Sequence, residues 1–97
     1  MQTFDVSLEN TQLWEGCEIE EVAGRKNVTT PMQEAINKIG RNAKAMLDPI
    51  ADDTIVLTGA APVWAYLTVF HQAVHRFSNV FYNDGRGGEA KVAKHSH

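Results

Sequence analysis

The feature that most constrains the fold is a short apolar run, residues 54–58, followed at once by small residues and a proline. The run reads Thr-Ile-Val-Leu-Thr and fits a fully buried strand that ends at Gly59. Pro62 suits the first turn of a following helix, where its missing N–H costs nothing. A strand, turn and helix of this kind direct free backbone N–H groups beyond the strand, where phosphate groups bind favourably. An ordinary tight turn would use the same residues, because Ala60 and Ala61 also let a helix pack closely on a strand.

The N-terminal half predicts a hairpin followed by a helix. Apolar residues alternate with polar ones over 4–8 and 17–20, which is typical of two paired strands. Residues 23–29 lack periodicity and contain glycine, so they are expected to form a loop. An amphipathic helix is then predicted over 31–47, with Thr30 as its cap and a proline at its first position.

The C-terminal half predicts a second helix and two more strands. Apolar residues three and four apart predict the helix over 62–76, and short strands are expected at 80–82 and 89–93 around a glycine-rich turn at 84–88. The whole chain is thus one α/β domain, 1–97, with the order β-β-α-β-α-β-β. In such a sheet the parallel pairs lie in the middle and ligands bind beyond the carboxyl ends of the strands. The turn at Gly59 and the segment after the 80–82 strand should therefore line one edge.

Length, charge and cysteine content narrow the class of protein. A chain of 97 residues is large enough for one core only, and self-association would add to its stability. The formal net charge of −3 argues against a broad electrostatic grip on nucleic acid, so any such ligand should be short and held locally. Cys17 is the only cysteine, which excludes an internal disulfide and fits a reduced, cytoplasmic setting. No apolar run approaches the ~20 residues of a membrane helix.

Side chains that can bind metal or phosphate are concentrated after residue 70. They are His71 and His75 on the second helix, Asp84 and Arg86 after the next strand, and His95 and His97 at the end of the chain. The two helical histidines share a face, a spacing compatible with metal binding. Each residue also has a simpler interpretation: surface histidines, a hairpin-turn aspartate in Asp-Gly, and a frayed tail. Trp64 and Tyr66 are by the same reasoning more typical of a core or a subunit interface.

The order of these residues resembles a known family. Gly59, then Pro62-Val63-Trp64, then His75, then Asp84-x-Arg86 and finally Ser96-His97 resembles the small CRISPR-associated ring nucleases of type III systems, also described as RNA deadenylases. The similarity covers about residues 54–97. It implies a variant of the CRISPR-associated Rossmann fold and a role in antiviral defence.

The resemblance also implies a site. Catalysis would fall to His75, Asp84, Arg86 and His97, and manganese would be held by Asp84, His75 and His97. The ligand, cyclic tetra-adenylate or a short 3′ oligoadenylate RNA, would contact Gly59, Ala60, Ala61, Pro62, Trp64 and Arg86. A homodimer, or a tetramer or higher assembly around the ligand, is implied as well. His71 has no firm counterpart in that family.

Two other classes of function remain open on the residues alone. The chain can be a module that binds or sequesters cyclic oligoadenylate without cutting it, in which case Gly59 and Arg86 matter for affinity only. It can also be an α/β assembly protein whose Trp64 and Tyr66 serve an interface. The first hypothesis, a metal-dependent phosphodiesterase that degrades the adenylate and switches off type III CRISPR signalling, needs His75 and Asp84 for its rate.

Overall fold

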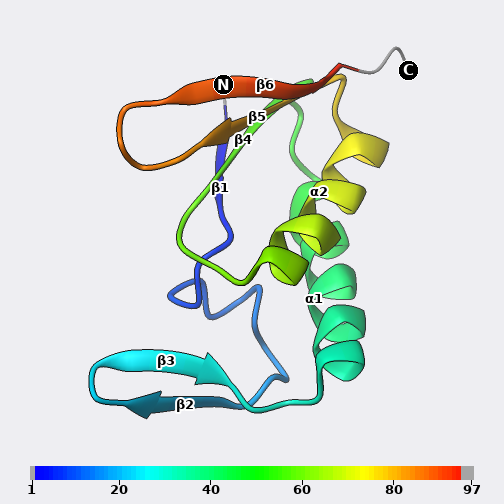
Figure 1. The fold of residues 1–97 in the computed structure, drawn as a ribbon. Coiled ribbons are helices and arrows are strands. Elements are labelled where there is room, and N and C mark those ends of the chain that lie inside the picture. The colour runs from blue at the N-terminus through cyan, green and yellow to red at the C-terminus, as the bar shows by residue number, and fades with distance from the viewer. Residues whose placement is uncertain (1, 95–97) are drawn as a thin grey trace.

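In a computed structural model, residues 2–94 are described and form a mixed four-stranded sheet in the order β1-β4-β5-β6 (Figure 1). The strands are β1 (Gln2–Asp5), β4 (Thr54–Thr58), β5 (Asn79–Asn83) and β6 (Glu89–Lys94). β4 runs parallel to both neighbours, β1 and β5, while β6 is antiparallel to β5. The central position of β4 agrees with its composition, since its three middle residues are all buried. The predicted α/β class, with parallel pairs in the middle of the sheet, is confirmed.

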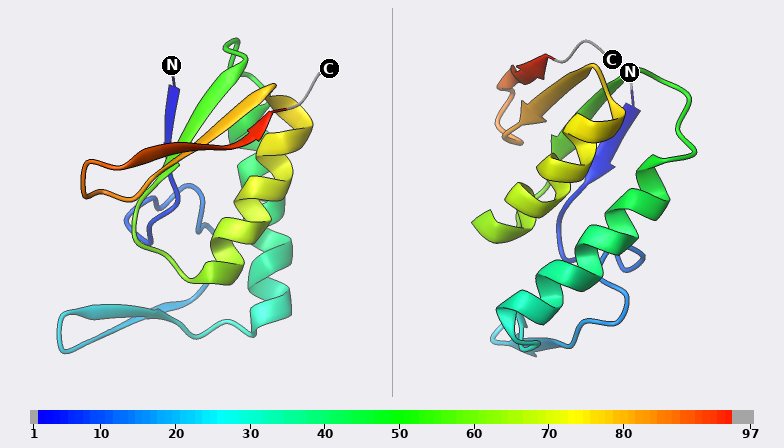
Figure 2. Two further views of the ribbon diagram at one scale, coloured as in Figure 1. Left: turned by 45° about the horizontal axis from the view of Figure 1, so that its top comes forward. Right: turned by 90° about the vertical axis from the view of Figure 1, so that its right-hand side faces the viewer.

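Both helices lie against the same face of this sheet (Figure 2). The helices are α1 (Met32–Leu47), which connects β3 to β4, and α2 (Val63–Arg76), which connects β4 to β5. β1, β4 and β5 follow each other in the same direction across the sheet, and right-handed crossovers between such strands place their helices on one side. The core between the layers joins the sheet to the apolar stripes of both helices and includes Ile39, Leu47, Ile55, Leu57, Val69 and Phe77. Neither helix is long and apolar enough to cross a membrane.

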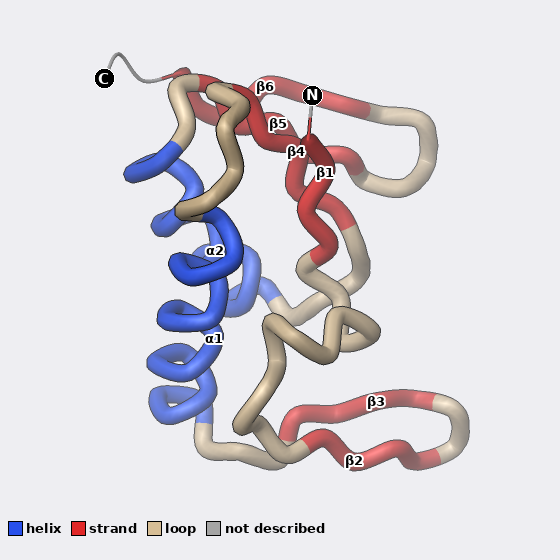
Figure 3. Tube along the Cα trace, turned by 180° about the vertical axis from the view of Figure 1, so that it is seen from behind, coloured by secondary structure: helices blue, strands red, loops and turns tan. Residues whose placement is uncertain are grey.

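The N-terminal strands pair differently from the prediction. β1 forms no hairpin with the next strand but lies parallel to β4, with Phe4 opposite Leu57. The expected loop at 23–29 instead contains a tight turn, in which Ala23 and Gly24 both have positive φ, and a further strand. This strand, β3 (Arg25–Val28), pairs with β2 (Ile19–Val22) in a separate two-stranded hairpin, which projects away from the main sheet (Figure 3). The observed order is therefore β-β-β-α-β-α-β-β.

The helix starts also differ in detail from the prediction. Pro31 and Pro62 occupy the cap position of α1 and α2 rather than the first helical position, and neither helix has a side-chain cap. Thr30 does not cap α1, because its Oγ1 accepts a hydrogen bond of 2.7 Å from the N–H of Glu18. Thr30 thus ties the base of the β2–β3 hairpin to the start of the helix. The ends of both helices lie where the sequence predicts them.

Candidate functional site

The turn at Gly59 and the loop after β5 lie at the same edge of the sheet, as the sequence predicts. β4 and β5 are parallel and in register, so Gly59 and Asp84 follow neighbouring strand ends. A hydrogen bond links the two strand ends: the hydroxyl of Thr58 donates to the carbonyl oxygen of Asn83 at 3.2 Å. β1 ends at the same edge, since Asp5 lies opposite Thr58. We call this region, formed by the chain after β1, β4 and β5, the carboxyl edge.

Gly59 is required by the geometry of the carboxyl edge. Its φ is 103°, a conformation that residues with a side chain rarely adopt. A Cβ atom at this position would meet the Oδ1 atom of Asp5 well inside van der Waals contact and the backbone nitrogen of Ser7 at 2.9 Å. The segment after β1 approaches this closely because the Asp5 carboxylate accepts hydrogen bonds from the N–H and the hydroxyl of Ser7, at 2.8 and 3.0 Å.

The start of α2 leaves backbone donors unused. The N–H groups of Ala65 and Tyr66 both donate to the carbonyl oxygen of Pro62, at 3.0 and 3.3 Å. The N–H groups of four residues before them have no protein acceptor within residues 2–94: Ala60, Ala61, Val63 and Trp64. Orphan donors at a helix start, together with the positive end of the helix dipole, favour an anion. The protein therefore has donors available for a phosphate group at this turn.

A cavity of about 440 Å³ lies beside the same turn. It is lined by the turn backbone, by apolar side chains of α2 and by two tyrosines, and its lining includes Gly59, Ala60, Ala61, Tyr66, Phe70 and Tyr82. Four exposed large apolar residues of the protein also belong to this lining: Val63, Leu67, Tyr82 and Val92. A cavity of this size with aromatic and aliphatic walls suits a flat apolar group such as a nucleobase.

Tyr66 joins the cavity to the turn. Its hydroxyl donates to the carbonyl oxygen of Gly59, and its ring packs edge to face on Tyr82 with centroids 5.5 Å apart. Burial raises the pKa of Tyr66 to about 12, so the phenol stays neutral at physiological pH. Because its O–H already donates within the protein, Tyr66 offers a ligand its ring rather than a hydrogen-bond donor.

Asp84 acts first as a turn residue. Its Oδ1 atom accepts hydrogen bonds from the N–H groups of Arg86 and Gly88, at 2.8 and 3.1 Å, and thereby shapes the loop between β5 and β6. The Asn83 side chain supports the same loop by accepting from the N–H of Gly85 at 2.8 Å. Within one chain, Asp84 therefore acts as the hairpin-turn residue of the simpler interpretation. Arg86 is exposed, and its guanidinium group has no hydrogen-bond or ion-pair partner in the described part of the chain.

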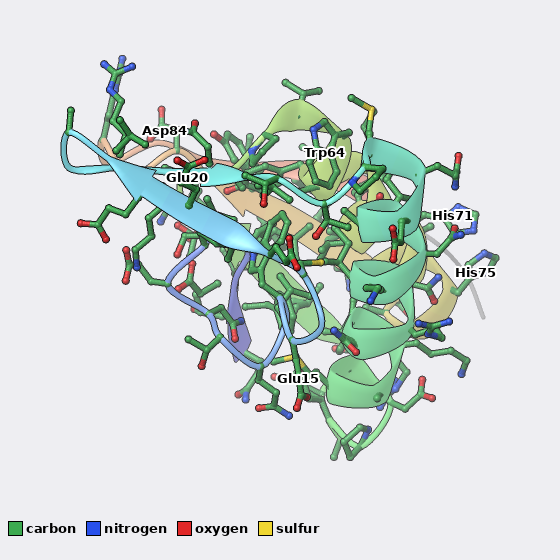
Figure 4. The ribbon with its side chains drawn as sticks, turned by 90° about the horizontal axis from the view of Figure 1, so that it is seen from below. Glu15, Glu20, Trp64, His71, His75 and Asp84 are labelled. Carbon is green, nitrogen blue, oxygen red and sulfur yellow. The ribbon has the colours of Figure 1, made fainter. Side chains whose placement is uncertain are left out.

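His75 lies at the opposite edge of the sheet. α2 runs back against the direction of β4 and β5, so its last turn reaches the start of these strands, where Arg76 donates to the carbonyl oxygen of Ile50. β5 has five residues, so its first and last Cα atoms lie roughly 13 Å apart. Figure 4 shows Asp84 on one side of the molecule and His71 and His75 on the other. The structure therefore does not bring the implied catalytic pair, His75 and Asp84, together within one chain.

The remaining implied residues are placed as follows. Trp64 contacts the core, with its ring edge to face on Trp14 at a centroid distance of 5.7 Å. It lines the groove between α1 and α2 rather than the cavity beside Gly59, so its expected ligand contact is not found at that cavity. His95 and His97 lie outside the described residues. Within residues 2–94, no three side chains of histidine, cysteine, aspartate or glutamate gather into a metal site.

Sequence reasoning missed two parts of the carboxyl edge. Asp5 and Ser7 were assigned to an alternating strand over 4–8, whereas the strand ends at Asp5 and the chain then turns. The available signal was the polar pair Asp5 and Ser7, which would lie at the carboxyl edge if this first strand paired in parallel with β4. Tyr66 and Tyr82 were missed because a cavity wall shared between a helix and a strand has no signature along the chain.

Comparisons of the chain with protein-family models, with curated proteins and with solved structures gave no match.

Proposed function

We propose that the protein binds the phosphates and bases of cyclic tetra-adenylate, or of a short 3′ oligoadenylate RNA, at the carboxyl edge and cleaves a phosphodiester bond there. One observation carries the proposal: unused N–H groups after Gly59 lie beside a cavity walled by Tyr66 and Tyr82. The N–H groups suit phosphate oxygens, and the tyrosine rings suit adenine. Degradation of this ligand would switch off type III CRISPR signalling.

We propose that Arg86 acts on a phosphate bound at this edge. It follows Asp84 in the loop after β5, and its guanidinium group is exposed and unpaired within residues 2–94. A planar, permanently charged guanidinium can stabilise negative charge on the phosphate oxygens as a 2′-oxygen or a water attacks in line. The proton transfers in that reaction need a general acid or base such as histidine.

Within one chain no histidine of the described residues meets Arg86, so we propose that cleavage uses two subunits. The end of one subunit that carries His75 would face the carboxyl edge of another. The manganese ligands implied by the resemblance do not fit a site in one chain, because Asp84 and His75 lie at opposite edges (Figure 4). We therefore assign no step to that metal.

A second candidate, a module that binds adenylate without cutting it, is favoured by a specific observation. The Asp84 carboxylate already accepts two backbone hydrogen bonds and holds its own loop. Binding at Gly59 and Arg86 would then account for the whole site.

Incubation with radiolabelled cyclic tetra-adenylate, with and without Mn²⁺, tests both candidates. Asp84→Asn is the informative variant, because asparagine keeps an Oδ1 acceptor for the loop and removes the charge. If the protein is an enzyme that uses the Asp84 carboxylate, as the resemblance implies, we expect this variant to lose cleavage while its affinity stays within about threefold. Binding without cleavage by the wild-type protein would select the second candidate, and absence of binding would overturn both.

Arg86→Lys tests the role of the guanidinium. Lysine keeps the charge but loses the planar fork, so we expect single-turnover cleavage to fall by about 10–100-fold. The matched control is Arg41→Lys, an exposed arginine on α1 that also lacks a partner among the described residues. Arg76 is unsuitable as a control, because it bonds to the carbonyl oxygens of Asp48 and Ile50. If Arg86→Lys cleaves at the wild-type rate, Arg86 has no role in cleavage and is only part of a solvated loop.

A further inference from the structure

The last two turns of α2 carry a pair of histidines whose rings contact each other. His71 and His75 are both exposed, and their Nε2 atoms lie 3.3 Å apart. Their rings meet edge to face, with centroids 4.7 Å apart and an angle of 77° between the planes. Figure 4 shows both imidazoles projecting from the helix on the same side, away from the sheet. The i and i+4 positions place the two side chains on one helix face.

We propose that His71 and His75 form a binding site for a divalent ion of the zinc class. Zn²⁺ binds histidine nitrogen at 2.0–2.1 Å in tetrahedral geometry, and these values require two nitrogen ligands to lie about 3.3–3.4 Å apart. The observed separation of 3.3 Å meets this requirement. Ligands at right angles, as in octahedral coordination, would need a separation of about 2.9 Å at the same bond length. The separation therefore suits tetrahedral coordination at zinc bond lengths, and the Irving–Williams order independently favours zinc over manganese at imidazole ligands.

The surroundings leave the pair free to bind an ion. Neither imidazole has a hydrogen bond to any other residue between 2 and 94, so an ion has to displace only the hydrogen bond between the two Nε2 atoms themselves. Exposure leaves the other two tetrahedral positions open to water or to a donor from another molecule. The site shares His75 with the ligand set that the resemblance implies but replaces Asp84 with His71. It does not depend on the proposed adenylate activity.

Calorimetric titration of the full chain with Zn²⁺ at about pH 7.5 tests the site. Two ligands retain part of the affinity of a complete four-ligand site, so we expect one ion per chain with a dissociation constant on the order of 1–100 µM. His71→Ala and His75→Ala should each weaken binding by at least about tenfold, because a single imidazole cannot chelate. Mn²⁺ should bind the wild-type protein at least about tenfold more weakly than Zn²⁺.

Two control variants separate this site from others. Gln72→Ala lies on the same helix and should keep the wild-type affinity. The double variant His95→Ala with His97→Ala removes the other two histidines of the chain and should keep it too. The proposal is overturned if the wild-type protein binds no Zn²⁺, if either single variant at His71 or His75 retains full affinity, or if the double variant loses it. Far-ultraviolet circular dichroism confirms that each variant folds.

Discussion

Single residues fix the shape of the carboxyl edge through contacts that few other side chains could make. Gly59 combines a positive φ with close approach to Asp5 and Ser7, and Tyr66 holds the carbonyl oxygen of Gly59. Asp84 shapes the next loop along the edge. These contacts are local, so each can be tested by one substitution and a stability measurement.

Gly59→Ala should destabilise the protein by about 2–4 kcal/mol, because the new Cβ adds a clash to an unfavourable φ. Gly85→Ala is the matched control: Gly85 also has a positive φ, of 76°, but a Cβ there meets no atom within 4 Å. It should cost only about 1–2 kcal/mol. Urea unfolding of both variants gives the comparison. Equal losses would show that the contact with the segment after β1 does not matter.

Tyr66 should titrate late in alkaline solution. Its pKa of about 12 in the folded protein exceeds the value of about 10 expected for an unfolded chain. The stability that it contributes is therefore complete below about pH 10 and is lost as the pH rises toward 12. Absorbance at 295 nm should show a step near pH 12 that Tyr66→Phe lacks. If the step that Tyr66→Phe removes lies near pH 10 instead, the burial of the phenol is contradicted.

The secondary-structure elements differ in how strongly they are held. β4 is buried along its middle, and α1 and α2 share the core with it. The β2–β3 hairpin has no buried residue. Its links to the rest include an exposed ion pair, Lys26 with Glu9 at 3.0 Å, and backbone bonds at its base such as Thr29 N–H to Glu18 oxygen at 2.9 Å.

Hydrogen exchange should therefore separate the two sheets. Amides of β2 and β3 are expected to exchange through local opening, well below the free energy of global unfolding, while those of β4 and β5 exchange only on global unfolding. The measurement is exchange at several low denaturant concentrations, followed by mass spectrometry. Protection of the hairpin equal to that of β4 would contradict its independence.

Sequence patterns predicted the elements that have a buried stripe. α1 and α2 were found because apolar residues recur at helical spacing and prolines mark their starts. β3 was missed because its four residues, Arg-Lys-Asn-Val, have neither alternation nor buried positions. The parallel pairing of β1 with β4 was missed because it joins segments far apart in the chain, whereas a hairpin with the next strand is the local alternative.

At the scale of the whole molecule, the two proposed sites lie at opposite ends of the fold (Figure 4). The carboxyl edge carries the Gly59 turn, Arg86 and the cavity beside Tyr66, while the histidine pair lies at the other end of α2. The shared edge of the two turns was predictable from the rule that parallel strands end together. The separation of His75 from Asp84 follows from the direction of α2, which returns the chain to the start of β5. The sequence did not reveal this separation, because His75 and Asp84 are close together along the chain.

The central claim is that cleavage at one carboxyl edge needs His75 from a second subunit. The most direct measurement is complementation: Asp84→Asn and His75→Ala proteins are mixed in equal amounts, left to exchange subunits, and assayed on cyclic tetra-adenylate. Each protein alone should be inactive, but half of the dimers in the mixture combine one subunit of each kind and carry one intact site of two, so about a quarter of the wild-type rate should return. If the wild-type protein cleaves but the mixture is as inactive as each variant alone, the claim is contradicted.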